Sequence, residues 1–354
     1  MDLIKLLQSA VERDASDIFL IPGLPLSYKV NGNILQQSGE ALPIPEIHHL
    51  IEEIYHLADD RAMERLRETG DDDFSFSVQG VSRFRISAFK QRNSYAAVIR
   101  VVHFNLPDYR ELRIPDLVMD VSRRSKGLVL VTGPAGSGKS TTLACIINAI
   151  NEQRTSHIIT LEDPIEYLHH HKRSVVTQRE IGVDSQSYVA ALRAALRQAP
   201  DVILLGEMRD HETIKTAITA AETGHLVFST LHTIGAANTI DRIIDSFAPE
   251  QQQQIRMQLS LQLVALISQQ LLATTGGEVI PAFEVVYLNS ALRNMIRESK
   301  THQIDAYIRS AADPAMRSMD DSLLELYGQG LITGETVLEC CSSPEQMGKR
   351  IKSL

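Results

Sequence analysis

The stretch that decides the fold is Gly133-Pro134-Ala135-Gly136-Ser137-Gly138-Lys139-Ser140. It fits the phosphate-binding P-loop pattern, G-x-x-x-x-G-K followed by Ser or Thr. The apolar run 127–132 before it predicts a buried strand, and the run 141–150 after it predicts a helix. Strand, glycine loop and helix in this order bring backbone N–H groups and a helix N-terminus to one anionic phosphate.

This loop predicts how ATP and Mg²⁺ would bind. Lys139 would reach the β- and γ-phosphates, and the Ser140 hydroxyl would ligate Mg²⁺. Thr141, at the start of the helix, is a further candidate for ATP binding. The remaining candidates are the other loop residues: Gly133, Pro134, Ala135, Gly136, Ser137 and Gly138.

Composition narrows the class of protein. The chain has 354 residues, which predicts two domains. Its 35 basic and 44 acidic residues give a net charge of −9, and 5% of residues are aromatic, so nucleic acid is not an expected partner. The three cysteines, Cys145, Cys340 and Cys341, form no C-x-x-C pair, which argues against a disulfide framework or a zinc site.

The sequence shows no signal-peptide core and no apolar run of membrane-spanning length. We therefore expect a cytoplasmic protein without a membrane span. A link to the membrane would go through a partner.

The sequence pattern divides the chain into three parts. Residues 1–103 predict a small α+β domain, and residues 104–114 predict a linker. From residue 115 to 354, predicted strands and helices alternate, which indicates an α/β domain with a parallel sheet and helices on both faces. Beyond about residue 290 the pattern becomes helical, and Ser343-Pro344 predicts the start of a final helix.

Two patterns support strands in the first domain. Asn31-Gly32, between strand-like runs, predicts a β-hairpin because its turn needs two positive φ angles. On the run 83–88, Phe84 and Ile86 are predicted to face one side and Arg83 and Arg85 the other.

An acidic residue follows a buried strand downstream of the P-loop. The run 202–205 is apolar, and Gly206 and Glu207 come directly after it. Ligands of an open parallel sheet bind at the carboxyl ends of its strands, so Glu207 is predicted to lie beside the P-loop. We expect Glu207 to hold Mg²⁺ through water or to orient the attacking water.

Three further acids, Glu162, Asp163 and Glu166, follow the strand-like run 158–161. Carboxylates this close repel one another unless they share a cation, so a metal-and-water site is predicted here. Glu162 and Glu166 are therefore candidate catalytic residues. Either Glu166 or Glu207 could orient the water, and the sequence leaves this open.

Two groups of residues could stabilise the negative charge that develops on the phosphate during transfer. His232 lies in a hydroxyl-rich turn after the apolar run 226–228, where it could contact the γ-phosphate and sense its loss. Arg83, Arg85 and Arg100 lie on predicted strands of the first domain. An arginine supplied in trans stabilises a transferring phosphate, so in a ring these side chains could reach a neighbour's nucleotide.

Together and in this order, these elements resemble the secretion ATPases of the type II/type IV pilus class over nearly the whole chain. The P-loop matches at 133–140, the acidic box at 159–167, the Walker B segment at 206–210 and the histidine box at 220–233. The resemblance implies a homohexameric ring. Each subunit would have a PAS-like N-terminal domain and a RecA-like C-terminal domain with ATP bound between them, and His232 would act at the nucleotide or the subunit interface.

Two features resemble the retraction branch of this class. Residues 291–298, ALRNMIRE, resemble its signature A-I-R-N-L-I-R-E, and the four-cysteine zinc module usual in the extension and type II secretion branches cannot form from three cysteines. The resemblance implies a motor for type IV pilus retraction and twitching motility. It would act on an inner-membrane platform protein, at the inner face of the cytoplasmic membrane.

Alternatives remain at the level of the sequence. Residues 197–201 resemble the accessory retraction paralogue, which leaves that role open. RecA-like cores also serve nucleic-acid motors, because fold alone does not fix function. A nucleotide-gated adaptor without hydrolysis is a third possibility, and the set of acids around the predicted site argues against it.

Overall fold

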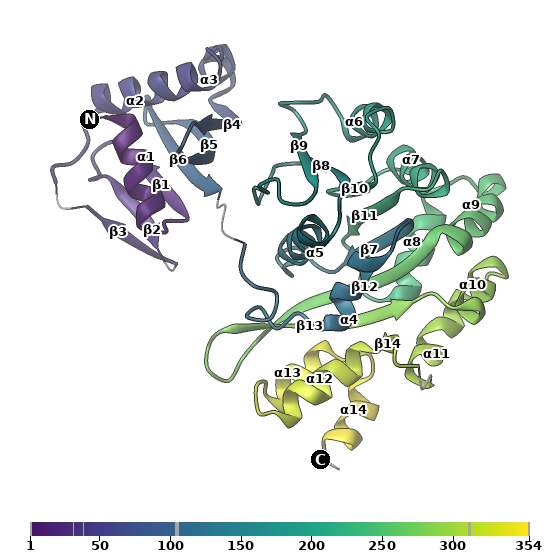
Figure 1. The fold of residues 1–354 in the computed structure, drawn as a ribbon. Helices are drawn as coiled ribbons and strands as arrows, with labels where there is room; N and C mark the ends of the chain where they lie inside the picture. The colour runs from purple at the N-terminus through teal and green to yellow at the C-terminus, as the bar shows by residue number, and fades with distance from the viewer. Residues whose placement is uncertain (1, 31, 38, 103–105, 311–312, 353–354) are drawn as a thin grey trace. The chain divides into compact units, whose positions relative to one another are not determined.

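The computed structural model describes residues 2–30, 32–37, 39–102, 106–310 and 313–352 (Figure 1). Contacts within the chain divide it into two units. The first unit comprises Met1–Asn105 and Glu166–Leu168, and the second comprises Leu106–Ile165 and His169–Leu354. Asn31 of the predicted hairpin turn and residues 103–105 at the predicted domain boundary lie outside the described residues.

The first unit contains an antiparallel sheet of six strands in the order β3-β2-β1-β6-β5-β4. Its strands are β1 (Asp17–Leu20), β2 (Ser27–Val30), β3 (Asn33–Gln36), β4 (Asp71–Val78), β5 (Ser82–Gln91) and β6 (Ser94–Val102). Its helices are α1 (Leu3–Glu12), α2 (Ile44–Leu57) and α3 (Glu64–Thr69).

Local sequence explains the first sheet. Val30 pairs with Asn33, as the predicted hairpin between β2 and β3 requires. Along β5, Phe84 and Ile86 are fully buried and pack with the residues of α2, whereas Arg83 and Arg85 are only partly buried. The alternation predicted for this strand is therefore confirmed, and it places both arginines on the face away from the core.

The second unit contains a mixed sheet of eight strands in the order β14-β13-β12-β7-β11-β10-β8-β9. Its strands are β7 (Gly127–Thr132), β8 (His157–Glu162), β9 (Val175–Glu180), β10 (Val202–Leu205), β11 (Leu226–Leu231), β12 (Leu263–Ala273), β13 (Val279–Tyr287) and β14 (Met316–Arg317). From β12 to β9 all neighbours are parallel, while β13 and β14 add an antiparallel edge.

Helices of the second unit lie between and after these strands. They are α4 (Asp116–Met119), the 3-10 turn η1 (Asp120–Arg123), α5 (Lys139–Gln153), α6 (Tyr188–Ala195), α7 (His211–Glu222), α8 (Ala236–Asp245), α9 (Pro249–Gln262), α10 (Ser290–Arg297), η2 (Thr301–Gln303), α11 (Ile304–Ser310), α12 (Met319–Gly328), α13 (Gly334–Cys340) and α14 (Pro344–Ile351). None of the helices in the described part of the chain is long and apolar enough to cross a membrane.

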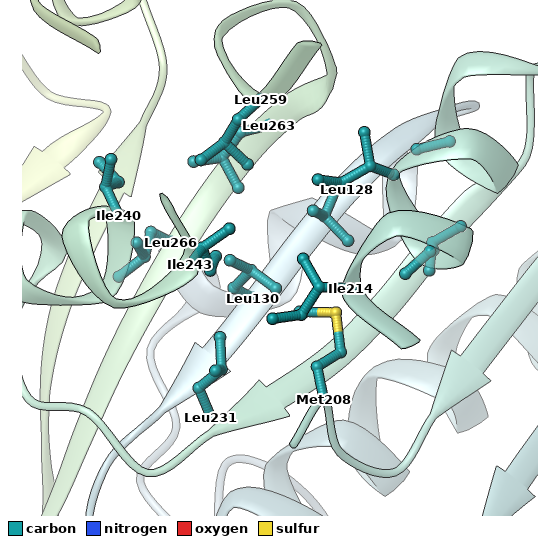
Figure 2. Packing of buried hydrophobic residues seen from close by; sticks show 14 of the residues in the cluster. Leu128, Leu130, Met208, Ile214, Leu231, Ile240, Ile243, Leu259, Leu263 and Leu266 are labelled. Atoms are coloured by element: carbon teal, nitrogen blue, oxygen red, sulfur yellow. The ribbon is translucent and has the colours of Figure 1, made fainter. Parts of the chain in front are cut away.

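Both faces of the parallel sheet are buried. In β7, Leu128 and Leu130 join the core under α6 to α10, whereas Val129 and Val131 join the core under α4 and α5. Figure 2 shows Leu128 and Leu130 among the side chains of the first of these cores. A strand covered on both faces reads as a continuous apolar run, which is why 127–132 was recognisable in the sequence.

The C-terminal helices form a smaller apolar core with the outer strands β12 and β13. Helix α10 begins after Asn289, whose side chain accepts a hydrogen bond from the N–H of Leu292, and it buries Leu292 and Ile296. The predicted final helix is confirmed as α14, with Pro344 in its first turn.

Candidate active site

The P-loop connects β7 to α5 as predicted. Its glycines occupy positions at which a side chain would strain the backbone or clash with a neighbour. Gly136 and Gly138 have φ angles of 76° and 84°, and Gly133 has a φ of 145°. A Cβ on Gly133 would lie 2.1 Å from the carbonyl oxygen of Gln269, and one on Gly138 would lie 2.9 Å from Gln269 Nε2. The loop is therefore packed directly against β12.

Lys139 lies inside this loop. It is 8% exposed, and its Nζ donates hydrogen bonds to the carbonyl oxygens of Gly133 at 2.9 Å and Pro134 at 2.8 Å. The hydroxyl of Ser137 is buried without a hydrogen-bond partner among the described residues. A buried ammonium and an unsatisfied hydroxyl in a glycine cradle fit an anionic phosphate.

Glu207 follows β10 at the same edge of the sheet as the P-loop. Its side chain is 13% exposed, and its Oε1 forms an ion pair with Arg209. Its Oε2 lies 3.5 Å from His232 Nε2. The structure therefore brings together the strand-ending acid and the histidine that the sequence singled out.

Thr230, near the end of β11, ties this strand to the loop after β10. Its hydroxyl donates to the carbonyl oxygen of Gly206 at 2.6 Å, and its own carbonyl oxygen accepts from the N–H of Met208 at 3.1 Å. His232 follows two residues later. His225 precedes β11 instead, so it lies at the opposite edge of the sheet, where its Nδ1 hydrogen-bonds the carbonyl oxygen of Ala220.

Glu162 ends β8 and is held by its neighbours. Its Oε1 accepts hydrogen bonds from the Thr160 hydroxyl at 2.5 Å and from Gln178 Nε2 at 3.3 Å. A hydrogen bond from the N–H of Ile165 to Glu180 Oε2 at 3.1 Å holds the turn that follows. Because β7, β8, β10 and β11 are parallel, Glu162 shares the P-loop edge of the sheet.

The other predicted residues belong to the first unit. Glu166 is exposed and lies in the segment Glu166–Leu168, which groups with that unit. Arg85 and Arg100 are cross-strand partners on β5 and β6, and Arg83 lies two residues from Arg85. Arg100 Nε also donates to the buried carboxylate of Asp17 at 3.1 Å. The three arginines therefore share one face of the first sheet.

A cavity of about 490 Å³ opens beside the P-loop within the second unit. Its walls come from residues 111–114, the start of α5, the strands β12 and β13, and Leu331. Thr141 and Gly138 are among its lining residues. This volume is in the range of small-molecule sites, and walls that mix apolar side chains with Glu111 and Glu278 suit a nucleobase more than a phosphate.

Three further residues at this edge of the sheet were not predicted from the sequence. Gln269 is 3% exposed and accepts a hydrogen bond from the Thr142 hydroxyl at 2.8 Å. Arg209 pairs with Glu207. Tyr188 lies close enough that a Cβ on Gly206 would be 2.8 Å from its hydroxyl.

Tyr188 adds a donor to the acidic part of the site. Burial, together with the nearby Glu207 and Asp163, raises the pKa of its phenol, so the proton is retained. Arg209 was next to the Walker B acid in the sequence and could have been found there. Nothing local marks Tyr188 or Gln269, because each is brought in by the fold.

The residues that could hold Mg²⁺ are Ser140 and Glu207, both of which offer oxygen. No group of three or more His, Cys, Asp or Glu side chains in the described part of the chain is placed to hold a metal ion. Mg²⁺ is commonly held by one or two protein oxygens, waters and substrate phosphates, so this donor set fits it. A P-loop at the carboxyl end of a central parallel strand is typical of the P-loop class of nucleotide-binding proteins.

Comparison with known proteins places the chain in a family. Residues 1–302 match the family model described as type II/IV secretion system protein, and the chain belongs to this family. The type IV pilus retraction ATPase PilT of Pseudomonas aeruginosa is 43% identical over 345 residues, covering 98% of this chain and 99% of PilT. The type IV pilus ATPase PilU of the same organism is 38% identical, covering 99% of this chain and 92% of PilU.

The fold agrees with the sequence comparison. The crystal structure of the pilus retraction motor PilT with bound ADP matches with a TM-score of 0.89 at 44% identity, over 99% of both chains. The predicted fold class, an α/β RecA-like core with a smaller N-terminal α+β domain, is thereby confirmed.

Proposed function

We propose that this chain is a hexameric motor ATPase that couples ATP hydrolysis to type IV pilus retraction and twitching motility. The observation that carries the proposal is the end-to-end likeness to PilT, in sequence and in fold, combined with a complete P-loop. The relative "Twitching motility protein" of Neisseria gonorrhoeae, 48% identical over 276 residues, supports the same assignment.

The P-loop would bind the phosphates of ATP, with Lys139 moving from the carbonyl oxygens of Gly133 and Pro134 to the β- and γ-phosphates. Ser140 and Glu207 would hold Mg²⁺, which neutralises charge that develops on the phosphates. The cavity beside Thr141 would receive the nucleobase of ATP. Its opening next to the first turn of α5 supports this placement.

Water activation falls to a carboxylate. Glu162 Oε1 is held at the sheet edge by Thr160 and Gln178, which favours a role in ordering water or metal. Glu207 is held by Arg209 and His232. Glu166 and Glu207 are the two candidates for the general base, and their Gln variants decide between them.

His232 would report the state of the nucleotide. It contacts Glu207, and Thr230, two residues before it, bonds Gly206. When the γ-phosphate leaves, a change at Glu207 would therefore pass to the loop after β11. Arg83, Arg85 and Arg100 would complete the site in trans in a homohexamer, which their shared face on the first sheet supports.

The remaining parts of the proposal concern partners. The ring would act on the inner-membrane platform protein of the pilus machinery from the cytoplasmic side. Removal of pilin subunits at the pilus base would shorten the filament.

Three variants test the enzyme. Lys139→Ala should abolish ATP hydrolysis and nucleotide binding, whereas Glu166→Gln and Glu207→Gln should bind ATP and turn it over at least about 100-fold more slowly. Binding and turnover are measured separately with a fluorescent ATP analogue and phosphate release. Normal hydrolysis by Lys139→Ala would contradict the P-loop assignment, and normal hydrolysis by Glu166→Gln would remove it as the base.

The likeness to PilU supports an accessory retraction role as a second candidate. Deleting the gene separates the functions. Excess pili without twitching would indicate the main retraction motor, loss of pili would indicate extension, and normal twitching would favour the accessory role. Restoration of twitching by the wild-type chain but not by Lys139→Ala links the phenotype to the P-loop.

A further inference from the structure

A carboxylate on β13 lies close to the N-termini of two helices. The N–H of Ala236, the first residue of α8, donates to Glu284 Oε1 at 2.9 Å. Met319, the first residue of α12, lines the same cavity as this carboxylate, and the N–H of the neighbouring Phe283 on β13 donates to the Ser322 hydroxyl of α12 at 3.2 Å. Helix N-termini carry unsatisfied N–H groups and partial positive charge, so the carboxylate stabilises the start of α8.

The neighbouring strand contributes a second bond to the same loop. Ser268 on β12 is the cross-strand partner of Glu284, and its hydroxyl accepts from the N–H of Gly235 at 3.1 Å. Two adjacent N–H groups, of Gly235 and Ala236, are thus held by two paired side chains. His232 lies three residues before Gly235, so these bonds fix the end of the loop that carries the histidine.

The C-terminal helices lie on the other side of Glu284 from α8. A cavity of about 310 Å³ lies between the start of α8 and the helices α11, α12 and α13. Close-packed interiors resist displacement, so an unfilled space here leaves room for a shift of the C-terminal helices relative to α8. Glu284 lines this space, with its bond to Ala236 on one side and the start of α12 on the other.

The position of Glu284 is costly for a carboxylate. Burial, with Asp305 and Asp320 nearby, raises its pKa to about 7, while the backbone N–H of Ala236 acts in the opposite direction. Arg309 lines the same cavity. Packing alone does not call for an acid here, which suggests a specific bonding role.

Building on the proposed ATPase function, we propose that Glu284 is a positioning residue for His232. It holds the loop after β11 on β13, the strand whose Phe283 N–H is bonded to α12, so a shift of the C-terminal helices would reach His232 through β13. Movement of these helices and loss of the γ-phosphate would then act on the same loop from its two ends.

The test uses Glu284→Ala and the nearly isosteric Glu284→Gln, whose amide oxygen can still accept from the N–H of Ala236 but carries no charge. The control is Asp320→Asn. Asp320 lines the same cavity and accepts hydrogen bonds from Ser342, but among the described residues it makes no hydrogen bond to the loop 232–236. Hydrogen exchange is followed in segment 233–239 without nucleotide, and kcat and KM for ATP are measured at pH 8.

In Glu284→Ala, exchange at Ala236 should speed up about tenfold or more, as expected when a bond to a charged group is lost. The kcat should fall by about tenfold with KM changed less than about twofold, because binding is left intact. Glu284→Gln should show smaller changes in the same direction. Asp320→Asn should behave like the wild type.

Each contrary result has a distinct meaning. Unchanged exchange in Glu284→Ala would refute the tie itself. Faster exchange with unchanged kcat would refute the positioning role, and an equal loss in Asp320→Asn would show a general effect of the cavity instead. If the wild type hydrolyses no ATP, the proposed function fails, and the exchange result still decides whether Glu284 holds the loop.

Discussion

Replacing Gly133 with alanine tests whether β12 sets the shape of the P-loop. The added Cβ would lie 2.1 Å from the carbonyl oxygen of Gln269 and 2.7 Å from the Ser137 hydroxyl. Ordinary contacts begin near 3.4 Å, so the loop or the strand must shift by roughly 1 Å. Gly136→Ala is the matched control, because its φ of 76° is also left-handed but no atom lies within 4 Å of its Cβ.

The magnitudes separate the two variants. A left-handed alanine costs about 1–2 kcal/mol, and this is the whole cost expected for Gly136→Ala. Gly133→Ala adds overpacking of about 1–3 kcal/mol, giving a total loss of about 2–5 kcal/mol in the free energy of unfolding. The Gly133 carbonyl oxygen also accepts from Lys139, so its displacement should weaken ATP binding as well.

Urea unfolding followed by circular dichroism measures the stability difference, since the chain has no tryptophan to report by fluorescence. A labelled ATP analogue measures the affinity. We expect Gly133→Ala to unfold at lower urea and to bind the analogue more weakly than Gly136→Ala. Equal stability and affinity in the two variants would refute the idea that β12 packs rigidly against the loop.

Three further predictions concern residues that the fold brings to the site or its flank. Gln269→Leu leaves the buried Thr142 hydroxyl without its acceptor, so we expect a loss of about 1–3 kcal/mol in urea unfolding and a higher KM for ATP. Tyr188→Phe keeps the ring but removes the hydroxyl beside Glu207, so kcat should fall while the unfolding free energy changes by less than about 1 kcal/mol; an unchanged kcat would show that the phenol is idle. Burial lowers the pKa of His169 to about 4 from 6.5, so between these values the unfolded state binds more protons; stability should fall as pH drops through this window, and His169→Asn should flatten that dependence.

Much of the fold was predictable because its signals are local. The run 127–132 is buried on both faces and therefore continuously apolar, and the helix after the P-loop begins at Lys139. The alternation on β5 and the hairpin of β2 and β3 are likewise confirmed. The antiparallel edge formed by β13 and β14 was not predicted, because strand order depends on pairing between distant segments.

The candidate site was predictable only in part. Acids at the ends of apolar strands could be read from the sequence, because parallel strands deliver their carboxyl ends to one edge. The sequence singled out His232, and the structure places it against Glu207, whereas His225 lies at the opposite end of β11.

The sequence by itself determined the phosphate-binding loop, the class of fold and the family, because each depends on residues close together along the chain. The tertiary structure decided what surrounds that loop. Gln269 lies 127 positions beyond Thr142, yet it fills the space that the loop glycines leave open. Glu284 likewise meets Ala236 only because β13 passes beside the N-terminus of α8. Contacts between segments so far apart depend on packing, and no local pattern records them.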